Sequence, residues 1–271
     1  MSHRTRHRLA PLLSALTLVA ALALAGCGAD STAGSGSGGG SGRDKRATGT
    51  LTVLGAASLT ETFTTLAKDF EADHPGVKVR LAFDSSATLA EQVVQGAPAD
   101  VLATADQATM RTVVDAHATQ GAPRVFATNH LQLVVPPDNP AGITRFSDLG
   151  KPGVKYVVCV DTAPCGKLAK TVLANTRTTA EPASQEVDVK AVLAKVELGE
   201  ADAGLVYATD AVAGGDKVKP IDIPTSNENL NTYPVAALAD AAQPGLARQW
   251  VDLVTGPTGR RVLADAGFGK P

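Results

Sequence analysis

The stretch that decides the fold runs from Thr50 to Phe83 and reads TLTVLGAASLTETFTTLAKDFEADHPGVKVRLAF. It opens with a short apolar run that ends at Gly55, a pattern typical of a buried strand. Apolar residues then recur at positions 59, 63, 66 and 70, and this spacing places them on one face of a helix. From Val77 to Phe83 apolar and polar residues alternate, which predicts a second strand. The order strand, helix, strand favours an α/β protein.

The rest of the chain continues this alternation. Further strands are expected at 100–104, 131–135, 155–160, 203–207, 217–223 and 233–238, and further helices at 88–95, 107–116, 166–175, 189–198, 244–255 and 257–265. Strands that alternate with helices form mostly parallel sheets with helices on both faces. The sequence shows no fixed-period repeat, so a solenoid is not expected.

The N-terminus has the pattern of an export signal. A basic start is followed by an uncharged run from Leu9 to Ala25, and Leu24-Ala25-Gly26-Cys27 places small residues directly before a cysteine. This ending resembles the bacterial lipobox, which implies cleavage before Cys27 and acylation of that residue; a transmembrane anchor is the alternative. Residues 1–26 are therefore interpreted as a lipoprotein signal peptide, and residues 27–48, rich in Gly and Ser, as a flexible tether.

The overall charge argues against non-specific attraction of anions. The formal net charge is −2, and removal of residues 1–26 deletes three arginines and no acidic residue, which lowers the charge to −5. Any anion site must therefore be local, because the protein as a whole repels anions. Basic patches interleaved with aromatic residues are also missing from the sequence, which disfavours nucleic acid as a partner.

Serines follow two successive strand ends. Ser58 comes shortly after the strand that ends at Gly55, and Ser85 and Ser86 follow the strand that ends at Phe83. In open α/β sheets, ligands lie beyond the carboxyl ends of strands, where helix N-termini present free N–H groups. Hydroxyl and N–H donors suit an acceptor-only oxyanion. The alternative is that these serines only cap helices, with Thr88 and Glu91 as a capping box.

Four motifs strengthen the first interpretation. They are Ala56-Ala57-Ser58-Leu59-Thr60; Ser85-Ser86-Ala87-Thr88-Leu89-Ala90; Gln95-Gly96-Ala97-Pro98-Ala99-Asp100-Val101 with Ala105-Asp106-Gln107; and Gly204-Leu205-Val206-Tyr207 with Thr209-Asp210-Ala211. In this order and spacing the chain, from about residue 50 to its end, resembles the periplasmic molybdate-binding proteins of ABC importers. The resemblance implies an oxyanion held without counter-charges by the hydroxyls of Ser58, Ser86 and Tyr207 and by the N–H groups of Cys165 and Val189.

The same resemblance implies an architecture and a biological setting. The expected fold is an α/β, two-lobed type II periplasmic-binding-protein fold with mostly parallel sheets and a ligand cleft between the lobes. Residues 49–130 and 233–271 would form lobe 1, and residues 131–232 would form lobe 2. The protein would be an extracytoplasmic lipoprotein anchored to the cell membrane, a monomer without a cofactor. It would carry molybdate or tungstate, which sequence cannot rank, to the permease of an ABC importer.

Cys159 and Cys165 remain as a pair once Cys27 is lipidated. In an oxidising compartment a disulfide between them is expected, and it would rigidify the loop that holds Cys165. Two free thiols are the alternative, and a metal site is disfavoured because no nearby histidine completes one. Many members of the family that this chain resembles carry a small aliphatic residue at the position of Cys165 in Pro164-Cys165-Gly166. The sequence therefore does not determine the exact shape of this loop.

Motifs for catalysis are missing from the sequence, which contains no nucleophile elbow, Walker loop, zincin motif or dinucleotide fingerprint. The protein is therefore not expected to be an enzyme. Three alternatives stay open: a receptor for another oxyanion such as sulfate or phosphate, an exported serine hydrolase that uses Ser58 or Ser86, and an adhesion or sensory module.

Overall fold

The computed structural model describes residues 48–224 and 226–271, which lie within one compact unit, Lys45–Pro271. The predicted signal peptide (1–26), the acylation site Cys27 and all of the predicted tether except Thr48 lie outside the described residues. Among the residues that are described, no helix has the length and apolar character needed to cross a membrane.

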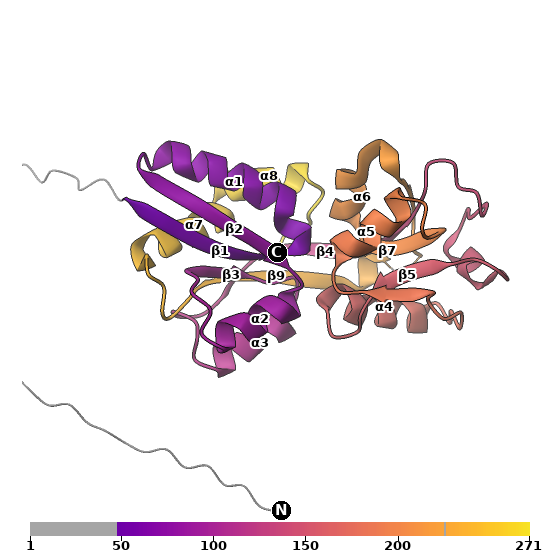
Figure 1. Ribbon diagram of the computed structural model, residues 1–271, viewed down its shortest axis with the longest axis horizontal. Coiled ribbons are helices and arrows are strands. Elements are labelled where there is room, and N and C mark those ends of the chain that lie inside the picture. The colour runs from indigo at the N-terminus through magenta and orange to yellow at the C-terminus, as the bar shows by residue number, and fades with distance from the viewer. Residues whose placement is uncertain (1–47, 225) are drawn as a thin grey trace, which may run out of the picture. The chain divides into compact units, whose positions relative to one another are not determined.

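A parallel three-stranded core with five helices forms what we call the first lobe (Figure 1). Strand β1 pairs with β2 on one side and with β3 on the other, in parallel. The elements are β1 (Gly49–Ala56), α1 (Thr60–Asp73), β2 (Val77–Asp84), α2 (Ser86–Val94), β3 (Val101–Ala103), α3 (Gln107–Asp115), α7 (Pro244–Thr255) and α8 (Pro257–Asp265), with the short 3-10 helix η1 (Ala57–Leu59) between β1 and α1.

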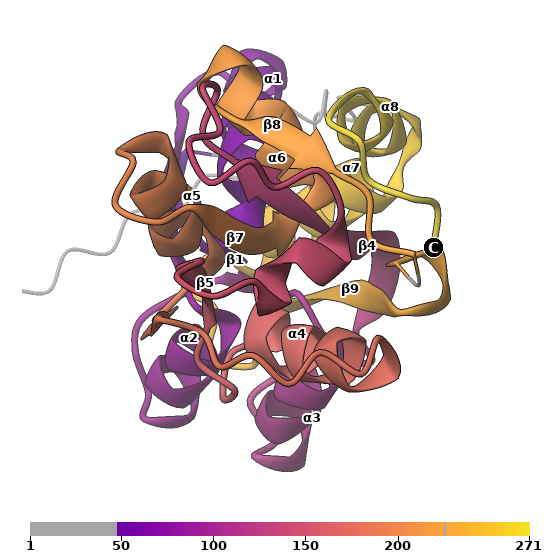
Figure 2. The same ribbon diagram turned by 90° about the vertical axis from the view of Figure 1, so that its right-hand side faces the viewer.

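The second lobe repeats this plan with strand β5 at the centre. Strand β5 pairs in parallel with β6 and β7, and Figure 2 shows α4 on one side of these strands and α5 and α6 on the other. The elements are η2 (Phe146–Gly150), β5 (Tyr156–Cys159), α4 (Pro164–Asn175), β6 (Ser184–Glu186), α5 (Val189–Glu197), β7 (Ala203–Tyr207), α6 (Ala208–Gly214), η3 (Gly215–Lys217), β8 (Lys219–Ile221) and η4 (Ser226–Glu228).

Two long strands, β4 (Arg124–Val135) and β9 (Leu230–Ala237), connect the lobes. Strand β4 pairs with β9 over residues 124–130 and with β7 over residues 131–134, while β9 pairs with β3 over residues 235–237. The strand order is therefore β2-β1-β3-β9-β4-β7-β5-β6, with β8 on β4. The expected parallel pairing holds within each lobe, whereas every pairing of β4 and β9 is antiparallel.

The core of the first lobe fixes the strand end that carries Ser58. The predicted apolar face of α1 is buried, since Phe63, Leu66 and Phe70 are at most 2% exposed. Phe63 and Phe70 each meet the buried Trp250 of α7 edge-on, with ring centroids 5.5 Å apart. Such aromatic pairs contribute about 0.5–1.5 kcal/mol each beyond their burial. Packing of α1 against α7 therefore holds the β1–η1 turn in place.

Candidate functional site

The five predicted ligand residues all lie where a strand or loop enters a helical segment. Ser58 lies in η1 after β1, and Ser86 is the first residue of α2 after β2. Cys165 is the second residue of α4, Val189 is the first residue of α5, and Tyr207 ends β7 directly before α6. Each residue is between 1% and 5% exposed, so the five are buried although they belong to different segments.

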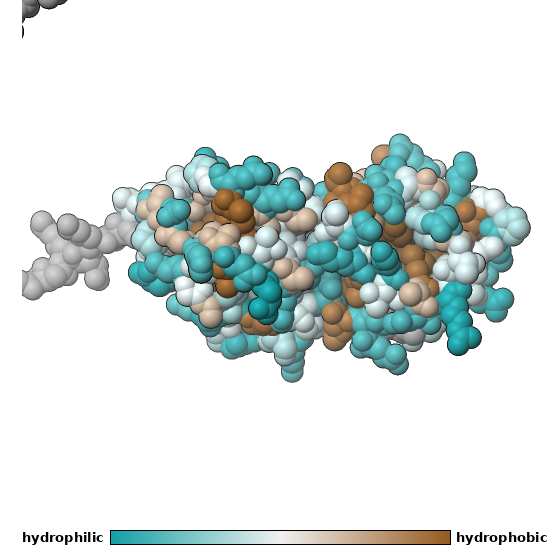
Figure 3. Space-filling view, turned by 90° about the horizontal axis from the view of Figure 1, so that it is seen from below, coloured by the Kyte–Doolittle hydropathy of each residue, from teal (hydrophilic) through white to brown (hydrophobic). Residues whose placement is uncertain are grey.

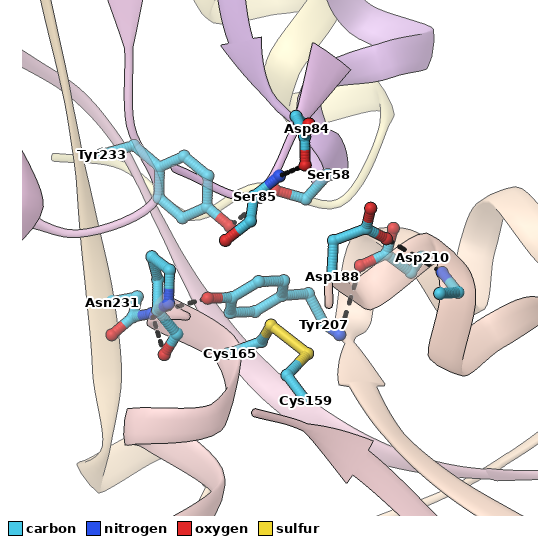
Figure 4. Close-up of a disulfide and its surroundings, with 12 residues drawn as sticks. Ser58, Asp84, Ser85, Cys159, Cys165, Asp188, Tyr207, Asp210, Asn231 and Tyr233 are labelled. Atoms are coloured by element: carbon cyan, nitrogen blue, oxygen red, sulfur yellow. Dashed lines mark hydrogen bonds between the residues drawn. A yellow bond between two sulfur atoms is a disulfide. The ribbon is translucent and has the colours of Figure 1, made fainter. Parts of the chain in front are cut away.

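These five residues line one pocket between the lobes. Figure 4 shows Ser58, Cys165 and Tyr207 at this place. Its other lining residues are Ala56, Ala57, Asp84, Ser85, Ala105, Pro164 and Asp188. The enclosed space is only about 10 Å³, roughly what a single water molecule requires by the same measure. The lobes therefore meet closely around this point, and larger grooves elsewhere on the described surface do not contain the predicted residues.

Three helices of eight or more residues start at this pocket: α2 from the first lobe, and α4 and α5 from the second. The N–H groups of a first helical turn have no acceptor within their own helix, and the helix dipole favours negative charge at this end. The N–H groups of Cys165 and Val189 belong to such first turns. The pocket thus offers backbone donors to an anion without any cationic side chain in its lining.

Two of the buried tyrosines, Tyr207 and Tyr233, bring hydroxyl groups to the site that stay protonated. Burial raises the pKa of Tyr207 well above its ordinary value, and burial likewise raises the pKa of Tyr233. Asn231, on β9, donates through its side-chain amide to the Tyr207 hydroxyl over 2.6 Å and to the Pro164 carbonyl over 3.2 Å. The amide of Asn231 therefore ties the Tyr207 hydroxyl to the start of α4 at the edge of the pocket.

The predicted serines have partners that fit a binding role better than catalysis. The Ser58 hydroxyl lies 2.9 Å from the Tyr233 hydroxyl, and the Ser86 hydroxyl accepts a 2.9 Å hydrogen bond from the N–H of Ala105. Neither hydroxyl contacts a histidine or a carboxylate in these bonds. Ser86 can still donate its proton to a ligand, since an oxygen that accepts a bond keeps its own O–H, and Ser58 can do the same when Tyr233 is the donor of their shared bond.

Several residues of the site were not among the five predicted ligands. Asp84, Ser85 and Asp188 line the pocket, and Tyr233 reaches it through its bond to Ser58. Ser85 was expected at this strand end, but the ligand contact was assigned to Ser86 alone. Tyr233 approaches from a strand about 175 residues away and has no local signal.

The capping box considered for Thr88 and Glu91 is not formed. Helix α2 already begins at Ser86, so Thr88 is its third residue rather than its cap. The cap position is taken by Ser85, which makes no side-chain cap bond.

The loop before α4 is held by a disulfide. Cys159 and Cys165 are bonded to each other, with Cα atoms 5.8 Å apart, so the end of β5 is tied to the first turn of α4 (Figure 4). Pro164 at the first helical position suits this start, because it has no N–H to leave unpaired. Gly166 comes next and packs tightly against the backbone of Val160, because a Cβ at this position would collide with the Val160 carbonyl oxygen.

Two sets of ion pairs bridge the lobes beside the pocket. Lys190 Nζ of α5 lies 2.8 Å from Glu61 of α1 and 3.0 Å from Asp210 of α6; the second is an ion pair without hydrogen-bond geometry. Lys167 of α4 lies 3.2 Å from Asp106 at the start of α3. These lysines are neutralised by carboxylates, so they hold the lobes together rather than lend charge to the pocket.

Burial controls the ionisation of this cluster. It raises the pKa of the fully buried Asp210 to about 6, and the nearby Lys190 offsets part of that rise. Burial also works to lower the pKa of Lys190, but Asp210 and Glu61 outweigh it, so the net pKa is raised. Lys190 therefore remains a cation that touches both lobes.

Comparison with known proteins agrees with this geometry. Residues 51–269 match the model of a family described as bacterial extracellular solute-binding protein. The molybdate-binding protein ModA of Mycobacterium bovis is 43% identical over 221 residues, covering 82% of this chain and 85% of that protein.

Two solved structures share the fold. The periplasmic molybdate-binding protein of Azotobacter vinelandii matches with a TM-score of 0.72 at 21% identity, covering 82% of this chain and 99% of that one. The sulfate-binding protein SubI of Mycobacterium tuberculosis matches with a TM-score of 0.71 at 19% identity, covering 81% of this chain and 86% of that one. With the family match across the described body and the ModA similarity, the chain belongs to the bacterial extracellular solute-binding protein family.

Proposed function

We propose that this chain captures molybdate, or tungstate, outside the cytoplasm and delivers it to an ABC importer. The observation that carries the proposal is that neutral donors from both lobes line one small pocket. A relative with 43% identity over most of both chains is a molybdate-binding protein. The ligands would be the hydroxyls of Ser58, Ser86 and Tyr207 and the N–H groups of Cys165 and Val189.

The chemistry of the pocket suits a fully deprotonated tetrahedral dianion. Such an ion presents only acceptors, and the pocket offers hydroxyl groups and first-turn N–H groups that donate. Asp84 and Asp188 also line the pocket, but each uses an oxygen to accept a backbone N–H, from Ser85 at 2.6 Å and from Ala191 at 2.9 Å. An anion that carries a proton gains no such match, because its O–H would face donors.

Delivery would follow from closure of the lobes. We assign residues 49–130 and 233–271 to lobe 1 and residues 131–232 to lobe 2, with the hinge where β4 and β9 change partners. A ligand that contacts both lobes favours the closed form in proportion to its difference in affinity for the two forms. The ABC permease would then recognise that form, with this chain acting as a monomer.

We further propose that the body is tethered to the membrane through acylated Cys27. On this proposal a Cys27→Ser variant is not lipidated and appears as precursor or released protein. Mass spectrometry of membrane fractions tests it, and a lipid-modified Cys27→Ser protein in the membrane would refute it.

Titration calorimetry of the chain with molybdate, tungstate, sulfate and phosphate tests the ligand assignment. Molybdate and tungstate should bind most tightly, because these larger tetrahedral ions reach donors of both lobes at a wider lobe separation than sulfate can, and because phosphate carries a proton at neutral pH. If sulfate or phosphate binds as tightly, only the broader function of an oxyanion receptor survives. The fold similarity to a sulfate-binding protein makes sulfate the necessary comparison.

A further inference from the structure

Ser85 carries a buried hydroxyl without a hydrogen-bond partner. The residue is 6% exposed and lines the pocket, and among the described residues its Oγ is one of few buried side-chain oxygens that lack a partner. Buried polar groups in native proteins are almost always bonded, so an exception at a ligand pocket indicates a group reserved for a ligand.

Helix capping does not account for this serine. Ser85 occupies the cap position of α2, but its hydroxyl makes no cap bond there. The cap residues of α3 and α5, Asp106 and Asp188, do accept N–H groups of their helices, at 2.7 Å and 2.9 Å. Ser85 therefore differs from these two caps, because its hydroxyl stays free of its own helix.

The backbone of Ser85 is fixed so that its side chain faces the pocket. Its N–H donates to Asp84 Oδ1 over 2.6 Å, which holds the residue at the end of β2. Figure 4 shows the hydroxyl directed toward the space between Ser58 and Tyr207. Donors dominate this space, so the complementary ligand group is an acceptor.

We propose that Ser85 donates directly to the bound oxyanion, as a third hydroxyl from the first lobe beside Ser58 and Ser86. This inference rests on the proposed function, since it names a further contact of the same site. Ser85 differs from Ser58 and Ser86 in one respect. Ser58 and Ser86 already take part in hydrogen bonds within the protein, whereas Ser85 gains its bond only in the complex.

That difference gives Ser85 a distinctive experimental signature. Loss of a hydrogen bond to a charged partner should weaken molybdate binding by about tenfold to a hundredfold in Ser85→Ala. The ligand-free variant should melt at the same temperature as the unaltered chain or higher, because alanine removes a buried hydroxyl that had no partner. A merely structural serine would instead lower the melting temperature and leave affinity per folded molecule unchanged.

The test compares the full chain, Ser85→Ala, Ser85→Thr and the control Ser147→Ala, whose serine is exposed on η2. Calorimetry with molybdate and thermal melting without ligand are measured for each. Weaker binding by Ser85→Ala with no loss of melting temperature, and partial recovery by Ser85→Thr, supports the inference. Unchanged affinity in Ser85→Ala, or a loss of melting temperature without a loss of affinity, overturns it. If the unaltered chain binds no molybdate, the proposed function itself fails, and this is evident before any variant is compared.

Discussion

Single residues of the pocket combine ligand contact and structural support in different proportions. Ser58 shares its hydroxyl with Tyr233, and Ser86 accepts a bond from the buried Ala105 N–H. A substitution at either position therefore removes a proposed ligand donor and also leaves a protein group without its partner. Ser86 is the clearer case, because its partner is a backbone donor that cannot move to another acceptor.

Ser86→Ala should lower both affinity and stability. The Ala105 N–H would lose its acceptor, and an unsatisfied buried donor costs about 1–3 kcal/mol of unfolding free energy. The lost ligand bond should weaken molybdate binding by about tenfold to a hundredfold. Urea unfolding and calorimetry measure the two effects, with Ser147→Ala as control. A variant as stable as the unaltered chain would show that the 2.9 Å bond to Ala105 contributes nothing to the free energy of unfolding.

Elements of secondary structure position the donors, and most of these elements could be predicted from the sequence. The helices α1, α3, α5, α7 and α8 have clear apolar periodicity and begin and end near their expected positions. Strand β4 was expected only from residue 131, because its first half mixes exposed and buried residues without strict alternation. The edge strand β6 is polar throughout, and α6 starts directly at the end of β7, so neither was expected.

The site was predictable to the extent that it lies in local motifs. Ser58, Ser86 and Tyr207 occur in stretches that resemble a known family, and the structure brings them together. Tyr233, Asn231 and Lys190 enter through contacts between distant segments, which no local pattern encodes. Ser85 lies in the same motif as Ser86, but the resemblance assigned the ligand contact to Ser86 alone.

The start of α4 depends on a residue without a side chain. Gly166→Ala should destabilise the protein by about 1–3 kcal/mol, the usual cost of overpacking, because the added Cβ meets the Val160 carbonyl. It should also weaken molybdate binding, since relief of the collision shifts the Cys165 N–H.

Gly245→Ala is the matched control for this change. It also lies in the first turn of a helix, α7, but a Cβ there meets no atom within 4 Å. Thermal melting and calorimetry of both variants should separate them, and equal behaviour would mean that the α4 start tolerates a shift.

At the scale of the whole molecule, charged groups decide how firmly the lobes stay together. Lys190 bridges Glu61 and Asp210, and Lys167 pairs with Asp106, so these two lysines of the second lobe each reach a carboxylate of the first lobe. Exposed apolar residues gather in separate patches on the face in Figure 3, without one continuous apolar surface there. The ion pairs between the lobes, together with the ligand, should therefore help to hold the closed form.

Asp210 makes the stability of the folded protein dependent on pH. Its folded pKa of about 6 lies above the ordinary value of 3.8, so the folded protein holds the proton more tightly than the unfolded chain. The contribution of Asp210 to stability is therefore complete below about pH 4 and falls as pH rises toward 6. A shift of about two units corresponds to at most about 3 kcal/mol.

Urea unfolding between pH 4 and 7 of the unaltered chain and of Asp210→Asn measures this contribution. The stability advantage of the unaltered chain over the variant should shrink across the window from about 4 to about 6 and then level off. Asp115→Asn, at an exposed position of α3, serves as control. A constant difference between the unaltered chain and Asp210→Asn would contradict the raised pKa.

The absence of a cation from the pocket lining has a kinetic consequence. A dianion that approaches this chain meets a negative protein, with Asp84 and Asp188 at the pocket itself, and is attracted only over the short range of hydroxyl and N–H dipoles. Added salt screens the long-range repulsion far more than those short contacts. Stopped-flow association of molybdate should therefore become faster as ionic strength increases, the reverse of the usual behaviour of a receptor that steers anions with positive charge. This chain would therefore capture its ligand faster in a salt-rich medium than in a dilute one.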